Sequence, residues 1–102
     1  MITDELRKLA EIAGLKPKEM MGDIRYWEKR KADWVLWQPH LRIEQAYSVE
    51  NGIPEEKRRE YIYQLIIATG QQGLPPTYNA WNLVHATADQ RCRAALAAAK
   101  EV

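Results

Sequence analysis

The sequence contains no phenylalanine and only one cysteine among its 102 residues. The single thiol, Cys92, excludes an internal disulfide framework and is typical of proteins from a reducing compartment. Without phenylalanine, the aromatic bulk of the core has to come from four tryptophans and five tyrosines. Each of these side chains carries a polar atom that needs a partner when the ring is buried.

The chain also lacks an excess of charge of either sign. Its 15 basic and 14 acidic residues give a net charge of +1, which provides no field to steer nucleic acid or an anionic membrane. No apolar run approaches the roughly 20 residues that cross a bilayer, and the first five residues do not resemble a signal peptide. These features predict a soluble, cytoplasmic protein that forms a single domain over residues 1–102.

Glycine and proline, with five residues each, divide the chain into predicted helices. The first helix runs from Thr3, its predicted cap, to Ala13, and Gly14 ends it. The second begins at Pro39 and ends at Asn51-Gly52, where a left-handed backbone is tolerated, and the third begins at Pro54 and ends at Gly70. Their predicted buried stripes are Pro39, Ile43, Ala46, Val49 and Ile53 on the second helix, and Tyr61, Ile62, Leu65, Ile66 and Thr69 on the third.

Two segments have the pattern of strands. Residues 33–37 form a short apolar run, and Trp81, Leu83 and His85 alternate with other residues over 80–86. Residues 16–33 are the least legible part: 23–30 fits either a strand or a helical turn, and Lys29-Arg30-Lys31 fits a charged turn between two short strands. These assignments leave the secondary structure of 16–33 open.

The last quarter of the chain carries the clearest start signal of a helix. Thr87 and Gln90 have the spacing of a capping box, and Cys92, Ala95 and Leu96 continue an apolar stripe behind it. The predicted order is therefore α-β-α-α-β-α. We expect an α+β fold in which a small antiparallel sheet, including residues 80–86, is packed with about four helices in a sandwich-like arrangement.

No group of residues predicts catalysis or metal binding. His40, His85 and Cys92 are the candidate metal ligands, but they are not clustered in the sequence, so we expect an inert buried thiol and a hydrogen-bonded structural histidine at position 85. Ser48 lies within a predicted helix and Thr87 is explained by capping. No phosphate loop or nucleophile motif is present, and we predict a protein without cofactor, metal or enzymatic activity.

One stretch, residues 25–37, has the character of a binding surface. Basic and aromatic side chains interleave there, which suits either single-stranded nucleic acid or a partner protein, since tryptophan and arginine are enriched at protein interfaces. The alternative is that the tryptophans form core and the basic run is a solvated turn. We expect a protein partner, including a second copy of this chain, ahead of nucleic acid. The candidate surface residues are Arg25, Trp27, Arg30, Lys31, Trp34 and Trp37.

Several segments carry a family pattern: a tryptophan and a proline before the central helix at Pro39, an arginine-rich segment from Arg58, and the closing motif Ala86-Thr-Ala-Asp-Gln-Arg91. Together with the opening helix around Leu9, they resemble small phage and prophage proteins of the phage ABA sandwich domain family. The chain departs from the usual family pattern at 44–47. The resemblance implies an α+β sandwich and a phage or prophage origin, and it implies no activity.

Overall fold

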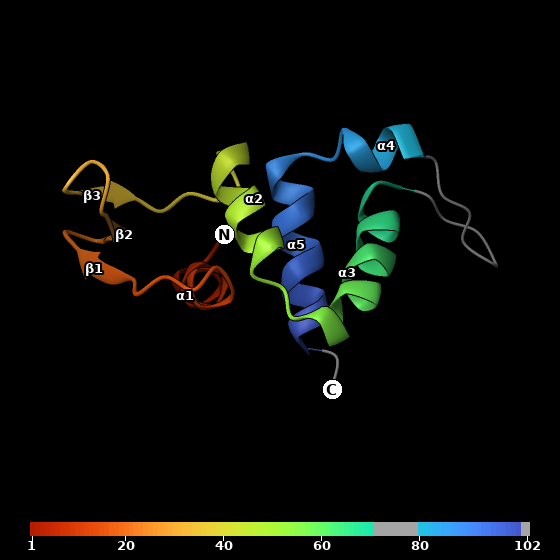
Figure 1. Cartoon of the computed structure of the whole chain (residues 1–102), viewed down its shortest axis with the longest axis horizontal. Helices are drawn as coiled ribbons and strands as arrows, with labels where there is room; N and C mark the ends of the chain where they lie inside the picture. The colour runs from red at the N-terminus through yellow and green to blue at the C-terminus, as the bar shows by residue number, and fades with distance from the viewer. Residues whose placement is uncertain (71–79, 101–102) are drawn as a thin grey trace.

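The computed structural model describes residues 1–70 and 80–100. Four helices of nine or more residues and one short helix accompany a three-stranded antiparallel sheet, so the predicted α+β class is confirmed (Figure 1). The elements are α1 (Thr3–Ile12), β1 (Lys18–Met20), β2 (Asp23–Glu28), β3 (Asp33–Leu36), α2 (Ile43–Asn51), α3 (Glu55–Ala68), α4 (Ala80–Val84) and α5 (Ala88–Lys100).

The sheet lies at one end of the molecule and is a meander in the order β1-β2-β3 (Figure 1). A two-residue turn, Met21-Gly22, joins β1 to β2, and φ is positive at both positions. A two-residue hairpin turn needs this backbone conformation to match the twist of the two strands. Lys29-Arg30-Lys31 lies in the turn between β2 and β3, which confirms the charged turn between short strands. Of the two alternatives for residues 23–30, a strand or a helical turn, the strand is therefore right, over Asp23–Glu28.

The other half of the molecule is built around α5. This helix packs against α1, α2 and α3, and in Figure 1 it runs between α2 and α3. Its predicted stripe is confirmed, because Cys92, Ala95 and Leu96 are all buried. The small alanine side chains that fill much of α5 allow three helices to approach it closely.

Two polar side chains hold the sheet to the helices. The Trp37 indole N–H donates to the carbonyl oxygen of Leu6 at 2.8 Å, which ties the end of the sheet to α1. Buried Gln45 of α2 accepts from the Gln38 N–H at 2.7 Å and donates to the carbonyl oxygen of Leu36 at 2.9 Å. These bonds satisfy groups that would otherwise be costly to bury.

Residues 80–86 are not a strand, and this prediction is wrong. They form α4 and the turn after it, with the His85 N–H donating to the carbonyl oxygen of Trp81 at 3.0 Å. The capping box that follows is confirmed: Gln90 N–H donates to Thr87 Oγ1 at 3.1 Å, and Thr87 N–H donates to Gln90 Oε1 at 2.9 Å. The element order is therefore α-β-β-β-α-α-α-α, and α5 closes over helices instead of over a sheet containing 80–86.

Helix boundaries and buried stripes also differ from the predictions. Ile43, predicted to be buried on the second helix, is 38% exposed. The second helix begins at Ile43, because a turn over 38–42 precedes it; Pro39 is buried in this turn and not in a first helical turn. The first helix is capped at Ile2, whose N–H donates to Glu5 Oε1 at 3.2 Å, and not at Thr3. On α3, Tyr61 and Leu65 are buried as predicted, but Ile62 is 45% exposed.

Gly52 ends α2 for a different reason from the one predicted. Its φ of −87° is not left-handed, so conformational freedom does not explain the glycine. A Cβ atom there would collide with the main chain of Ile12 and Ala13 at the end of α1. Glycine is therefore needed because two helix ends touch at this point.

Candidate functional site

Strand alternation divides the side chains of the sheet between two faces. Ile24 and Tyr26 point toward Trp37 and the core, while the opposite face, here called the outer sheet face, points away from it. The register of the three strands assigns seven side chains to the outer sheet face: Lys18, Met20, Asp23, Arg25, Trp27, Trp34 and Leu36. Apolar, aromatic and cationic groups therefore share one surface.

Trp27 and Trp34 form the centre of the outer sheet face. They are directly opposite each other on β2 and β3, with ring centroids 5.6 Å apart and an edge-to-face angle of 72°. Trp27 is 48% exposed, and the ammonium group of Lys18 lies 5.6 Å from the Trp34 ring centroid. Such aromatic and cation–π contacts hold the rings in place by about 0.5–1.5 kcal/mol each, so the surface is ordered before any partner arrives.

The charges near the tryptophans are mixed. Arg25 lies 3.8 Å from Asp23, and Arg30 and Lys31 are exposed in the turn beyond the tryptophan pair. The Glu28 carboxylate accepts a hydrogen bond from the Arg30 main-chain N–H at 3.1 Å, which stabilises this turn. Because carboxylates accompany the basic groups, the surface is only weakly cationic.

The structure brings together three of the six predicted surface residues, Arg25, Trp27 and Trp34. Arg30 and Lys31 lie in the adjacent turn. Trp37 does not belong to the surface: it is 1% exposed and packs edge-on against Tyr26 at 5.5 Å. The prediction of Trp37 as a surface residue is wrong, because the residue opposite Ile24 points to the core face.

Sequence reasoning missed Lys18, Met20 and Leu36. Leu36 alternates with Trp34 along β3, so the outer face could have been extended to it from the period of two. Lys18 and Met20 depend on recognising the hairpin at Met21-Gly22, where a single glycine follows two methionines. The signal was present but weak, since Asn-Gly and Asp-Gly are the usual markers of this turn.

A pocket of about 370 Å³ adjoins Trp27. It lies beside the part of β2 beyond Arg25, which β1 does not cover because β1 begins at Lys18, the partner of Arg25. The loop after α1 forms its other side. The lining residues are Gly14, Leu15, Lys16, Tyr26, Trp27 and Lys29.

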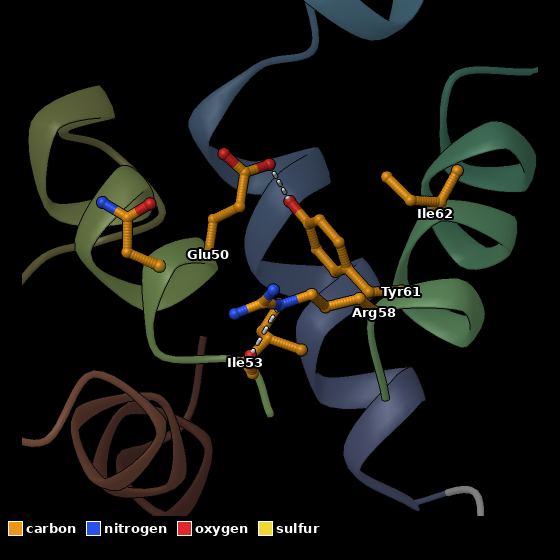
Figure 2. Close-up of a pocket in the computed structure, with 6 residues that line it drawn as sticks. Glu50, Ile53, Arg58, Tyr61 and Ile62 are labelled. Carbon is orange, nitrogen blue, oxygen red and sulfur yellow. Dashed lines mark hydrogen bonds between the residues drawn. The ribbon is translucent and has the colours of Figure 1, made fainter. Parts of the chain in front are cut away.

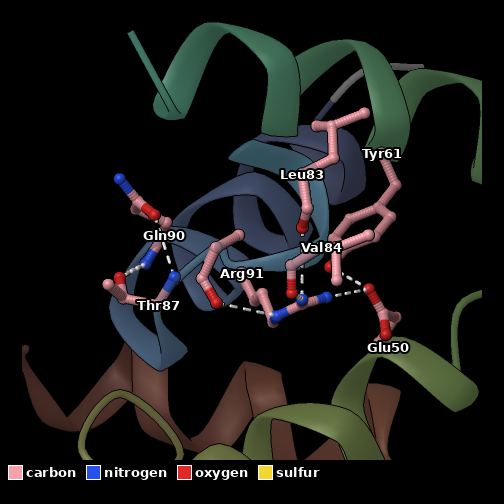
Figure 3. Close-up of polar contacts among 8 residues, drawn as sticks. Glu50, Tyr61, Leu83, Val84, Thr87, Gln90 and Arg91 are labelled. Atoms are coloured by element: carbon pink, nitrogen blue, oxygen red, sulfur yellow. Dashed lines mark hydrogen bonds and ion pairs between the residues drawn. The ribbon is translucent and has the colours of Figure 1, made fainter. Parts of the chain in front are cut away.

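A buried polar cluster lies in the helical half, around Arg91. The guanidinium group donates to Glu50 Oε1 at 2.8 Å (Figure 3). Its central carbon also lies over the Tyr47 ring, 5.1 Å from the ring centroid. The guanidinium group also donates to main-chain carbonyl oxygens at the end of α4 and in the turn after it: Leu83 at 3.2 Å, Val84 at 3.1 Å and Ala86 at 3.2 Å. Arg91 thus caps the carboxyl end of α4.

The same carboxylate of Glu50 accepts a hydrogen bond from the Tyr61 hydroxyl at 2.7 Å (Figure 2). Burial and the neighbouring carboxylate raise the pKa of Tyr61, so the phenol stays protonated and keeps donating. A shallow pocket of about 500 Å³ opens beside this pair between α2 and α3, and its wall includes Ile53, Arg58 and Ile62 (Figure 2). Arg58 Nε donates to the Ile53 carbonyl oxygen at 3.3 Å, so the polar groups here serve first to hold the helices.

The other candidate groups lie apart from one another. Cys92 is buried and burial raises the pKa of its thiol to about 12, as expected of an inert thiol. His85 Nδ1 lies 2.9 Å from the Trp81 carbonyl oxygen, which agrees with a structural histidine. Burial lowers the pKa of His40, whose Nδ1 has no hydrogen-bond partner among the described residues. Within residues 1–70 and 80–100, no three His, Cys, Asp or Glu side chains are grouped as metal ligands.

No helix in the described part of the chain is long and apolar enough to span a membrane. Comparisons of the sequence with protein-family models, of the sequence with curated proteins, and of the structure with solved structures found no match.

Proposed function

We propose that this protein acts by binding a partner protein through the outer sheet face, without catalysis. The observation that carries the proposal is the cross-strand pair of Trp27 and Trp34, held edge-to-face on a surface that points away from the core. Exposed tryptophan beside arginine is the composition of interface hot spots. The adjacent apolar side chains, Met20 and Leu36, extend the surface in a way that suits protein side chains more than phosphates and bases.

The backbone of the β1–β2 hairpin supports the same proposal. Met21 occupies a left-handed conformation at the tip of the β1–β2 hairpin with a fully exposed side chain, although glycine or asparagine would be less strained there. Strain kept in an exposed apolar residue is typical of sites that serve recognition. The pocket beside Trp27 could receive a partner side chain where β1 leaves the edge of β2 uncovered.

The test compares two variants in the same pull-down from bacterial lysate. We expect Trp27→Ala to lose partners that the parent chain retains, and Trp81→Ala, which removes another exposed indole outside the sheet, to keep them. Circular dichroism checks that both variants fold. Equal capture by the parent chain and the Trp27 variant would rule out the outer sheet face as the binding surface.

A second candidate function is weak binding of single-stranded nucleic acid by the same surface. The observation that favours it is the ammonium group of Lys18 over the Trp34 ring, next to the basic turn at Arg30 and Lys31. Titration of an oligonucleotide against tryptophan fluorescence decides it. Binding that weakens steeply with salt supports nucleic acid, and no binding at low salt excludes it.

The resemblance of the closing motif and the central helix to phage ABA sandwich proteins leads us to propose a phage or prophage accessory protein that works in the host cytoplasm. Induction of a resident prophage should then raise the level of this protein. A constant level on induction would count against this origin.

A further inference from the structure

A helix is normally apolar on one side only, but α3 is apolar on two opposite sides. Tyr61 and Leu65 are buried against α5, as the extensive contact between these helices requires. On the opposite side, Tyr63 is 45% exposed and Ile67 is 39% exposed. Half-buried Ile66 and the 45% exposed Ile62 continue this surface toward the pocket between α2 and α3. A helix that is apolar on both sides is expected to be covered on both sides.

We propose that this outward side of α3, Ile62, Tyr63, Ile66 and Ile67, binds a second copy of the same chain. The four residues form two adjacent i,i+4 ridges, 62–66 and 63–67, which is the pattern that interdigitates when two helices cross. The patch is self-complementary in an antiparallel pair: Ile62 of one copy meets Ile67 of the other, and Tyr63 meets Ile66. This is the arrangement that a two-fold axis through the patch requires.

Charge favours a second copy over an unrelated partner. None of the four side chains is charged, so the contacts among them desolvate no ion. The same register places Arg59 of one copy beside Gly70 of the other, at the carboxyl end of its α3, where the helix dipole is negative and a cation is stabilised. The net charge of +1 leaves little repulsion between copies.

The size of the patch sets the strength of the dimer. Four partly exposed side chains offer on the order of 300 Å² of apolar surface per copy, below the roughly 800 Å² per partner of a standard stable interface. The dimer is therefore weak and concentration-dependent. The partner-binding outer sheet face belongs to a different part of the molecule and remains open in this dimer (Figure 1).

Sedimentation velocity over about 1 μM to 1 mM tests the proposal. We expect Tyr63→Lys and Ile67→Lys each to raise the dissociation constant at least about tenfold. Ile43→Lys is the matched control, because Ile43 on α2 is 38% exposed but lies off the patch, and it should dimerise like the parent chain. Arg59→Glu should weaken the dimer, and salt should reduce the difference between it and the parent chain.

Two results would overturn the proposal. One is a parent chain that stays monomeric throughout this concentration range. The other is a dimer that survives both α3 substitutions while the variants remain folded by circular dichroism. Because Trp27→Ala should leave the dimer intact, a failure here is distinguishable from a failure of the proposed partner binding.

Discussion

Substitution of Gly52 by alanine should destabilise the protein although the backbone at this position suits any residue. The added Cβ would lie 2.8 Å from the carbonyl carbon of Ile12, 0.6 Å short of the 3.4 Å at which ordinary contact begins, and closer still to its carbonyl oxygen. The obstacle is main chain, so no side-chain rotation relieves it, and the ends of α1 and α2 have to separate. Overpacking of a core costs about 1–3 kcal/mol, and we expect about 3 kcal/mol here.

Urea denaturation followed by circular dichroism measures this cost, which should also lower the melting temperature by roughly 10–20 °C. The matched control is Gly14→Ala. Gly14 has a φ of +77° but open space around its Cβ position, so only backbone strain of about 1–2 kcal/mol is expected. If Gly52→Ala were no more costly than Gly14→Ala, close approach of the two helix ends would not be the reason for this glycine.

Arg91→Met should lower the free energy of unfolding by about 3 kcal/mol, because it leaves Glu50 and the carbonyl groups around the end of α4 without their donor. Arg91→Lys should recover little of this loss, because one ammonium group cannot reach all of these acceptors. A loss below about 1 kcal/mol in urea denaturation would contradict this prediction. Cys92 should react with a thiol reagent only in denaturant, and fast labelling of the native chain would show that its burial is incomplete. His40 has a lowered pKa when folded, so the unfolded chain binds more protons as pH falls below about 6.5, and stability present above that pH should be lost below it. The terminal amino group and Arg93 disfavour the charged form of His40, whereas Asp89 favours it. The parent chain should therefore lose more stability than the His40→Gln variant between pH 7.5 and 5.5. Equal losses would refute the role of His40. Met21→Asn should raise stability by about 1 kcal/mol, because asparagine tolerates the left-handed turn better, and a melting temperature that does not rise would contradict this.

Features decided by local chemistry were predictable from the sequence. The capping box at Thr87 and Gln90 is local to four residues, and the approximate positions of α1, α2 and α3 followed from glycine and proline. Residues 80–86 were misread because a segment this short shows too little of either period to separate helix from strand. The end of α4 is bonded by Arg91, several residues further along the chain, and a local pattern does not show such a bond.

The candidate site was partly predictable for the same reason. Trp27 and Trp34 were identified from composition, but their separation from Trp37 depends on the register between β2 and β3. A shift of one residue along a strand moves a tryptophan from the solvent-facing side of the sheet to the core side. The register is set by the pairing of two strands, so the sequence of one strand does not show it. Whether Ile62 is buried depended likewise on which side of α3 meets α5.

The position of α5 in the chain has a consequence for synthesis. Because α1, α2 and α3 all pack on α5, their common core cannot close until the ribosome has made residues 88–100. At about 5–20 residues per second, α3 waits roughly 2–6 seconds after its own completion with both apolar sides uncovered. The nascent chain in that interval is a ready substrate for chaperones, whereas the β meander, built from neighbouring residues, has all its strands by Leu36.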